Sequence, residues 1–212
     1  MRQFNFVDQL VMLADNSLKT LIGGYQTTQR KNPAESVEKP ELTKAEQKHA
    51  AGLMRINHCG EVCAQALYQG QALTAKLPDV RDKMEEAAKE ENDHLAWCSQ
   101  RLTELDSHVS FLNPIWYAGS FAIGAVAGAV GDKWSLGFVA ETEHQVVRHL
   151  ESHLEKLPEN DESSRAILEQ MKEDEQHHAT TALDAGGAEL PEPIKKTMTL
   201  MSKVMTKTVY YV

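Results

Sequence analysis

Apolar residues recur along most of the chain at intervals of three and four positions, a spacing that predicts helices. No run of Val, Ile, Thr and Tyr alternates with polar residues in the period of two that marks a half-buried strand. We therefore predict an all-α protein. The helices are expected at about residues 4–22, 44–76, 79–105, 133–157, 162–184 and 193–209.

Residues that start and stop helices support this division of the chain. Thr43, with Glu46 three positions on, resembles a capping box and opens the long second helix. Pro78-Asp79 predicts the turn that follows it, and the segment from Pro158 to Asp161 predicts a second tight turn. Gly23-Gly24 is a plausible stop for the first helix.

An uncharged segment interrupts the pattern at residues 109–131. Its length would suit a membrane span of about 20 residues. Asn113-Pro114 breaks it early, however, and Gly119, Gly124 and Gly128 dilute its hydrophobicity. We therefore predict a buried or membrane-surface segment whose small residues contact a neighbouring helix.

The length of 212 residues fits one domain with a substantial core. A polar stretch from Gln26 to Pro40 separates the first helix from the others. We expect an amphipathic N-terminal extension and linker at residues 1–40 and a helical domain at residues 41–212.

The net charge of −9 argues against nucleic acid as a partner, because phosphate binding requires a cationic surface. The charge is uneven, since every charged residue after Glu192 is a lysine: Lys195, Lys196, Lys203 and Lys207. Three cysteines without a CxxC pair, and an N-terminus without a signal-peptide pattern, favour a reducing, cytoplasmic compartment.

Two short motifs carry candidate chemistry, and each is a Glu-x-x-His on a predicted helix. They pair Glu91 with His94 and Glu175 with His178. Three residues advance a helix by about 300°, so the two side chains of each motif lie about 60° apart on one face and can hold a single ion. One such motif alone is weak evidence, because Glu and His are common in helices.

The spacing of two further acids strengthens the case. Glu61 precedes Glu91 by 30 residues, and Glu143 precedes Glu175 by 32. The midpoint of each interval falls at a predicted turn, so each pair is expected at the same level on two antiparallel helices. Two hairpins, each with one lone Glu and one Glu-x-x-His, supply the ligand set of carboxylate-bridged dimetal four-helix bundles.

The helical wheel around Glu143 is apolar: Leu136, Val139, Ala140, Val146, Val147 and Leu150. An unpaired carboxylate on such a face would be costly. Four acids that point into a core require compensation, and two divalent cations would neutralise them while the imidazoles stay neutral.

Neighbouring acids and histidines have plainer interpretations. Glu141 and His177 point away from the core faces of Glu143 and Glu175, so we interpret both as surface residues. Glu90 and Asp93 are expected to be solvated.

Two further histidines and the cysteines leave alternatives open or favour packing. His58 and His149 fit equally well as hydrogen-bond partners of metal ligands and as structural histidines. A zinc site is less plausible than small buried hydrophobes for the three cysteines, Cys59, Cys63 and Cys98.

From about Ala45 onward, the sequence resembles the demethoxyubiquinone hydroxylases of ubiquinone biosynthesis. The matching features are Arg55-Ile56-Asn57-His58-Cys59-Gly60-Glu61, both Glu-x-x-His motifs, the uncharged segment and the region of Glu143. One departure is Glu141-Thr142-Glu143, where the family commonly has two adjacent acids. Glu143 is therefore identified as the ligand of this region by its spacing from Glu175 and by the helical wheel.

The resemblance implies a ferritin-like four-helix bundle with a long crossover segment and extra N- and C-terminal helices. It implies a di-iron monooxygenase that uses O₂ to hydroxylate the ring of a polyprenylated methoxy-methyl-benzoquinol, demethoxyubiquinol. Two iron ions, ferrous in the O₂-reactive state, would be held by six residues, with Glu91 or Glu175 bridging: Glu61, Glu91, His94, Glu143, Glu175 and His178. Glu and His ligation with open positions suits iron better than a closed zinc site.

A polyprenyl substrate lies in the bilayer, so the enzyme is expected to meet a membrane. Segment 109–131, with Leu112, Trp116 and Phe121, would enter the lipid, and the basic C-terminal helix would meet anionic head groups. We expect a peripheral protein at the cytoplasmic face of the cell membrane, with a homo-oligomer or other ubiquinone-biosynthesis proteins as further partners.

Two alternatives remain at this stage. One is a ferritin relative that stores iron or handles peroxide, and the other is a non-catalytic, membrane-associated helical scaffold.

Overall fold

Helices make up most of the part of the chain that the computed structural model describes, which is residues 6–28, 30–39 and 41–212. The elements are α1 (Phe6–Ile22), the 3₁₀ turn η1 (Pro33–Ser36), α2 (Lys44–Thr74), α3 (Pro78–Glu104), α4 (Asn113–Val130), α5 (Asp132–Leu154), α6 (Glu162–Asp184) and α7 (Glu192–Val209). Because no strand occurs within these ranges, the all-α prediction is confirmed.

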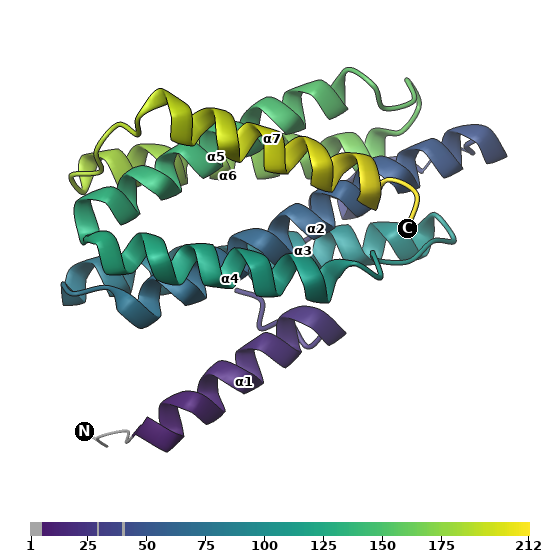
Figure 1. The fold of residues 1–212 in the computed structure, drawn as a ribbon. Helices are drawn as coiled ribbons and strands as arrows, with labels where there is room; N and C mark the ends of the chain where they lie inside the picture. Colours follow the sequence, from purple (N-terminus) through teal and green to yellow (C-terminus); the bar gives the residue numbers. More distant parts are fainter. Residues whose placement is uncertain (1–5, 29, 40) are drawn as a thin grey trace.

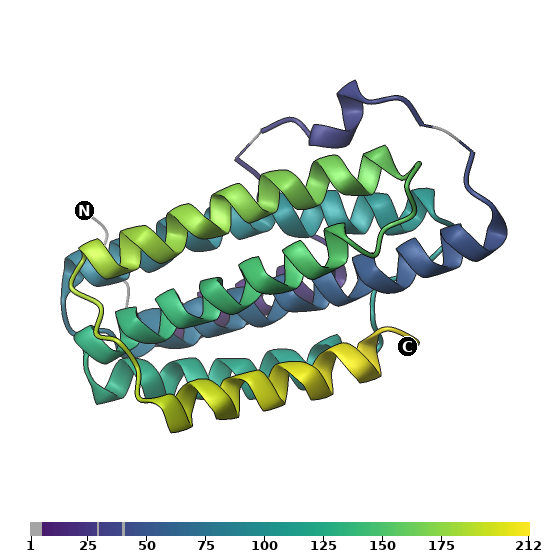
Figure 2. The same cartoon turned by 90° about the horizontal axis from the view of Figure 1, so that it is seen from above.

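Two antiparallel hairpins, α2 with α3 and α5 with α6, form a four-helix bundle (Figure 1). α4 connects the hairpins by running along α2 from one end of the bundle to the other. α7 packs outside α2 and α5, on the same side of the bundle as α4 (Figure 2). The long crossover and the extra terminal helices therefore occur as expected.

Local sequence signals set most helix ends. The Thr43 hydroxyl accepts a hydrogen bond from the Glu46 backbone N–H, and the Glu46 carboxylate accepts one from the Thr43 backbone N–H. The predicted capping box is therefore formed. Gly23 adopts a φ of 91°, which closes α1 in a conformation that glycine tolerates best. The polar linker differs from a plain loop, because Asn32 caps the short turn η1.

The uncharged segment folds as the surface helix α4. In the described part of the chain, no helix combines the length and the apolar character that a membrane crossing requires. Trp116 and Phe121, expected at the lipid, are instead half-buried against the bundle. The large apolar side chains that are exposed on α4 and at the second residue before it are Phe111, Ile115, Val126 and Val130.

Small residues let α4 lie close against α2. A Cβ atom at Gly124 would collide with the Leu67 carbonyl oxygen, and one at Gly128 would collide with the Thr74 side chain. Gly70 presses in the same way on the backbone of α4 at Phe121. The predicted contact through small residues is confirmed, and it positions α4 beside the centre of the bundle.

This contact predicts opposite effects for two glycines of α4. Gly124→Ala should destabilise the protein by about 1–3 kcal/mol, because the added methyl group forces two helix backbones apart. Gly119→Ala should stabilise it by up to about 1 kcal/mol, because alanine favours helix and nothing lies within 4 Å of the new atom. Denaturant unfolding measures both, and equal effects would contradict the close packing.

Candidate metal centre

Six predicted ligands from four helices meet in the middle of the bundle. α2 supplies Glu61, α3 supplies Glu91 and His94, α5 supplies Glu143, and α6 supplies Glu175 and His178. The most exposed of them, His178, is 7% exposed. The structure therefore gathers all six in a space that water hardly reaches.

His94 faces three carboxylates. Its Nδ1 lies 3.2 Å from Glu91 Oε2, 3.1 Å from Glu175 Oε1 and 3.5 Å from Glu61 Oε2. One donor atom from each of these four residues lies within 4.8 Å of all the others. This spacing is compatible with a single metal ion between them.

His178 meets the same two carboxylates from the opposite side. Its Nδ1 lies 3.2 Å from Glu91 Oε1 and 3.1 Å from Glu175 Oε2. Glu91 and Glu175 thus each direct one oxygen to His94 and the other oxygen to His178. A carboxylate in that position can bridge two ions.

Glu143 completes the half of the cluster near His178. Its Oε1 accepts a hydrogen bond from the Tyr68 hydroxyl, whereas its Oε2 is buried without a hydrogen-bond partner. Burial, followed by the negative charges of Glu175 and Glu91, raises the pKa of Glu143 well above its ordinary value.

The far side of each histidine ring contacts an acid that was not predicted to take part in the site. His94 Nε2 lies 2.9 Å from Asp174 Oδ2, and His178 Nε2 lies 2.6 Å from Glu90 Oε2. A carboxylate only accepts hydrogen bonds, so each ring donates from Nε2 and turns Nδ1 to the cluster. The available signal was the acid directly before each Glu-x-x-His.

Burial and crowding dominate the electrostatics. Burial and the charge of Glu91 raise the pKa of Glu61 well above its ordinary value, and burial does the same for Glu143. Burial alone would also raise the pKa of Glu91, but hydrogen bonds from His178 and His94 outweigh it and hold that pKa low.

The histidines show the reverse balance. Burial alone would lower their pKa values, but hydrogen bonds to the surrounding carboxylates raise the pKa of both His94 and His178. The carboxylates around the two rings therefore favour positive charge at this place in the bundle.

The donor atoms fit a metal site. Among the described residues, buried oxygens without a hydrogen-bond partner include Glu91 Oε1, Glu143 Oε2 and Glu175 Oε1. Buried polar atoms are normally satisfied, so three such oxygens in one cluster fit a site that holds cations. Two divalent ions would supply the positive charge that the four carboxylates lack.

Two acids expected at the surface are buried instead. Asp93 is fully buried, and it accepts hydrogen bonds from Thr28 and Arg30 of the N-terminal segment. Glu141 is 9% exposed, because it binds Gln145 and Arg148 beside α7.

The other two surface assignments divide. Glu90 is only partly exposed and contacts His178, so the prediction that it is merely solvated was wrong. His177 is exposed, as expected.

His58 and His149 had two possible roles, as partners of metal ligands or as structural histidines. Their hydrogen bonds in the described part of the chain go to residues other than the six predicted ligands. His58 pairs with Tyr25 at 2.9 Å and with Asn113, and His149 lies beside Ser202. The structure favours the structural interpretation for both. The cysteines are free and lie in or against the apolar core, as expected: Cys59, Cys63 and Cys98.

An apolar pocket leads to the cluster between α2, α4, α5 and α7, and Glu61 forms part of its wall. Gly60, Thr142 and Gln145 also line it. The remaining lining is mostly apolar and includes Ile56, Ala64, Leu67, Trp116, Ile123, Val146, Met198 and Met205.

Comparison with known proteins agrees with this site. The chain is 62% identical over 211 residues to a 3-demethoxyubiquinol 3-hydroxylase of Acinetobacter baumannii, with both chains covered completely. It is 56% identical over 211 residues to the protein of the same name from Nitrosococcus oceani, covering 100% of this chain and 99% of the relative.

A solved structure supports the fold. A dodecameric thioferritin, the bacterioferritin-related protein of Bacteroides fragilis, superposes with a TM-score of 0.56 at 18% identity. The match covers 65% of this chain and 84% of that one, and shows that the bundle is ferritin-like.

The family model for ubiquinone biosynthesis protein COQ7 matches residues 48–209, a range that contains all six clustered residues. With this match and relatives that are similar over their whole length, the chain belongs to the COQ7 family of ubiquinone biosynthesis proteins.

Proposed function

We propose that this protein is a di-iron monooxygenase that hydroxylates the ring of demethoxyubiquinol, a polyprenylated methoxy-methyl-benzoquinol, late in ubiquinone biosynthesis. The observation that carries the proposal is the position of Glu91 and Glu175, each with one oxygen toward His94 and the other toward His178. The names of the full-length relatives supply the substrate and the reaction.

The positions of the donor atoms support a division of the ligands between two iron ions. One ion would be held by Glu61 and His94, and the other by Glu143 and His178, with Glu91 and Glu175 bridging them. When bound, iron would supply the electrons and the open coordination positions that O₂ activation requires. One oxygen atom of O₂ enters the ring, and the other leaves as water after two electrons and two protons are taken up.

The surrounding residues have three tasks in this reaction. The apolar pocket accepts the ring and directs it toward Glu61, while its apolar walls exclude water. Tyr68 holds the Glu143 carboxylate through a hydrogen bond that its hydroxyl group donates to Oε1. Asp174 and Glu90 hold the two imidazoles in the orientation that metal binding needs.

The two acids of Glu141-Thr142-Glu143 give a matched test of the site. Glu143→Ala should abolish quinone synthesis in a strain that lacks its own hydroxylase and should lower the iron content of the purified protein. Glu141→Ala should retain both quinone synthesis and iron content. The Glu141 carboxylate lies away from the cluster and pairs with Arg148, with 3.2 Å between Oε1 and Nη2. Mass spectrometry of the accumulated quinones and metal analysis provide the readouts.

Three results would contradict the proposal. They are a wild-type protein that holds far less than two irons, normal quinone synthesis with Glu143→Ala, and loss of quinone synthesis and iron in Glu141→Ala but not in Glu143→Ala. A scaffold would keep its function in both variants.

Gly60 offers a separate test of the pocket. An atom added there would enter the pocket wall with nothing else within 4 Å. Gly60→Leu should therefore lower kcat/KM by about tenfold or more, as expected when about 1–3 kcal/mol of binding is lost. Gly60→Ala should have a smaller effect, and iron content should stay normal in both. An unchanged kcat/KM in Gly60→Leu would place the substrate elsewhere.

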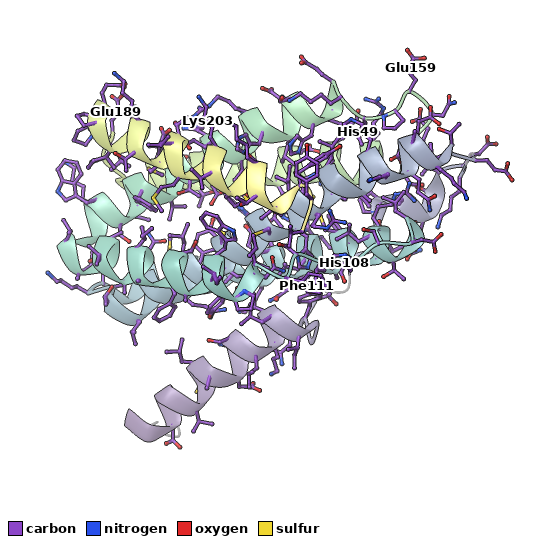
Figure 3. The ribbon with its side chains drawn as sticks, turned by 45° about the vertical axis from the view of Figure 1, so that its right-hand side comes forward. His49, His108, Phe111, Glu159, Glu189 and Lys203 are labelled. Carbon is purple, nitrogen blue, oxygen red and sulfur yellow. The ribbon has the colours of Figure 1, made fainter. Side chains whose placement is uncertain are left out.

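We also propose that the substrate enters from a membrane through the surface formed by α4 and α7, which flank this pocket. Ile115 and Val126 of α4 are 69% and 64% exposed, and Leu200 of α7 is 63% exposed. Lys203 lies on α7, and Phe111 precedes α4 (Figure 3). An apolar face with nearby lysines suits a peripheral position on anionic lipid, at the cytoplasmic face of the cell membrane.

Liposome co-sedimentation tests this surface. Ile115→Ser with Val126→Ser should reduce binding to anionic vesicles several-fold, because both side chains would lose contact with lipid. Leu183→Ser is the matched control, since Leu183 is 42% exposed on α6, across the bundle from α4 and α7 (Figure 2). Equal losses in both proteins would contradict the assignment of this face.

A further inference from the structure

The N-terminal segment reaches the metal centre through one side chain. Arg30 Nε donates to Asp93 Oδ2 at 2.8 Å, and its Nη1 donates to Asp174 Oδ2 at 2.8 Å. The guanidinium also lies 5.0 Å from the centre of the Trp97 ring. Arg30 therefore joins two acids, one from α3 and one from α6, that would otherwise repel each other.

Asp174 connects Arg30 to the cluster. Its Oδ2 accepts from Arg30 and also from His94 Nε2, which lies 2.9 Å away. The same imidazole turns Nδ1 to Glu61, Glu91 and Glu175. Any rotation of the Asp174 carboxylate would thus change the orientation of His94.

The backbone beside Arg30 is also attached to α3. The Thr28 N–H donates to Asp93 Oδ1 at 2.8 Å, and the Thr28 hydroxyl donates to Oδ2 of the same carboxylate. Asp93 is fully buried, so these bonds are sheltered from water. They hold the segment in the position from which Arg30 reaches Asp174.

The other histidine has weaker support from Arg30. The hydrogen bond from His178, and to a smaller extent the charge of Arg30, lower the pKa of Glu90, but in the described part of the chain Arg30 forms no ion pair with it. Glu90, the counterpart of Asp174, contacts His178 at 2.6 Å, and its side chain is 37% exposed. Among the residues that the structure describes, His178 is the only ion-pair partner given for Glu90. The two halves of the cluster are therefore built alike but braced differently.

We propose that Arg30 is a positioning residue for the metal ion at His94, acting through Asp174. The N-terminal segment would then be a working part of the centre, although the family model begins only at residue 48. This inference rests on the proposed two-metal function.

Anaerobic titration of the full-length, metal-free protein with Fe²⁺ tests the inference, with calorimetry resolving two binding constants. Arg30→Gln should weaken one constant about tenfold, the lower end of what partners of metal ligands contribute, and change the other constant much less, because Arg30 forms no ion pair with Glu90. Asp174→Asn should weaken the same constant. The double variant should bind no more weakly than Asp174→Asn alone, because Arg30 acts through that residue.

Two further variants identify the sites. Glu90→Gln should weaken the other constant, so that its combination with Arg30→Gln weakens both. Lys39→Gln is the control within the N-terminal segment, since Lys39 binds Glu104 at 2.8 Å. It should leave both constants unchanged.

Unfolding of the metal-free variants separates positioning from general stability. A selective loss of one constant supports the proposal, whatever the change in unfolding free energy. Wild-type constants in Arg30→Gln, or equal weakening of both constants, would overturn it while leaving the two-metal function intact. If Arg30→Gln does not fold, the Asp174→Asn comparison decides in the same way. A wild-type protein that binds fewer than two ions would refute the proposed function itself.

Discussion

Four carboxylates buried at the centre of a helical bundle are the constraint on which the rest of the structure depends. Carboxylates lose their hydration on burial, and neighbouring negative charges make ionisation harder still. Burial and neighbouring charges raise the pKa values of Glu61 and Glu143. Hydrogen bonds to the same carboxylates raise the pKa values of His94 and His178. An arrangement that is so poorly balanced without metal is suited to bind cations.

The helices around the cluster exclude water from it and leave an apolar pocket that reaches Glu61. Glycines bring α4 against α2, and this closes one side of the bundle. α7 lies outside α2 and α5, so the apolar pocket remains between α4 and α7. The wall that excludes water therefore also contains the route to Glu61.

Hydrogen bonds outside the ligands give the centre its orientation. Each histidine donates to the acid that precedes the Glu-x-x-His motif of the other hairpin. The two hairpins are thus interlocked, since each Glu-x-x-His motif supplies two predicted ligands and the acid before it is the outer partner of the other motif's histidine. Arg30 extends this arrangement into the N-terminal segment on one side only.

Periodicity and spacing along the chain predicted the helices of the bundle, its two hairpins and the six residues that lie together at its centre. This was possible because helical periodicity and equal hairpin arms are local properties, and they place Glu61 level with Glu91 and Glu143 level with Glu175. Even the choice of Glu143 over Glu141 followed from which face of one helix is apolar.

Only the tertiary structure decided which neighbours the ligands have. Asp93 looked solvated because its partners Thr28 and Arg30 lie more than 60 residues away, in a segment that periodicity treats as a linker. Asp174 reaches His94 from another helix, and the pocket depends on where α4 and α7 lie. Such contacts depend on how separate elements pack, which no local spacing encodes.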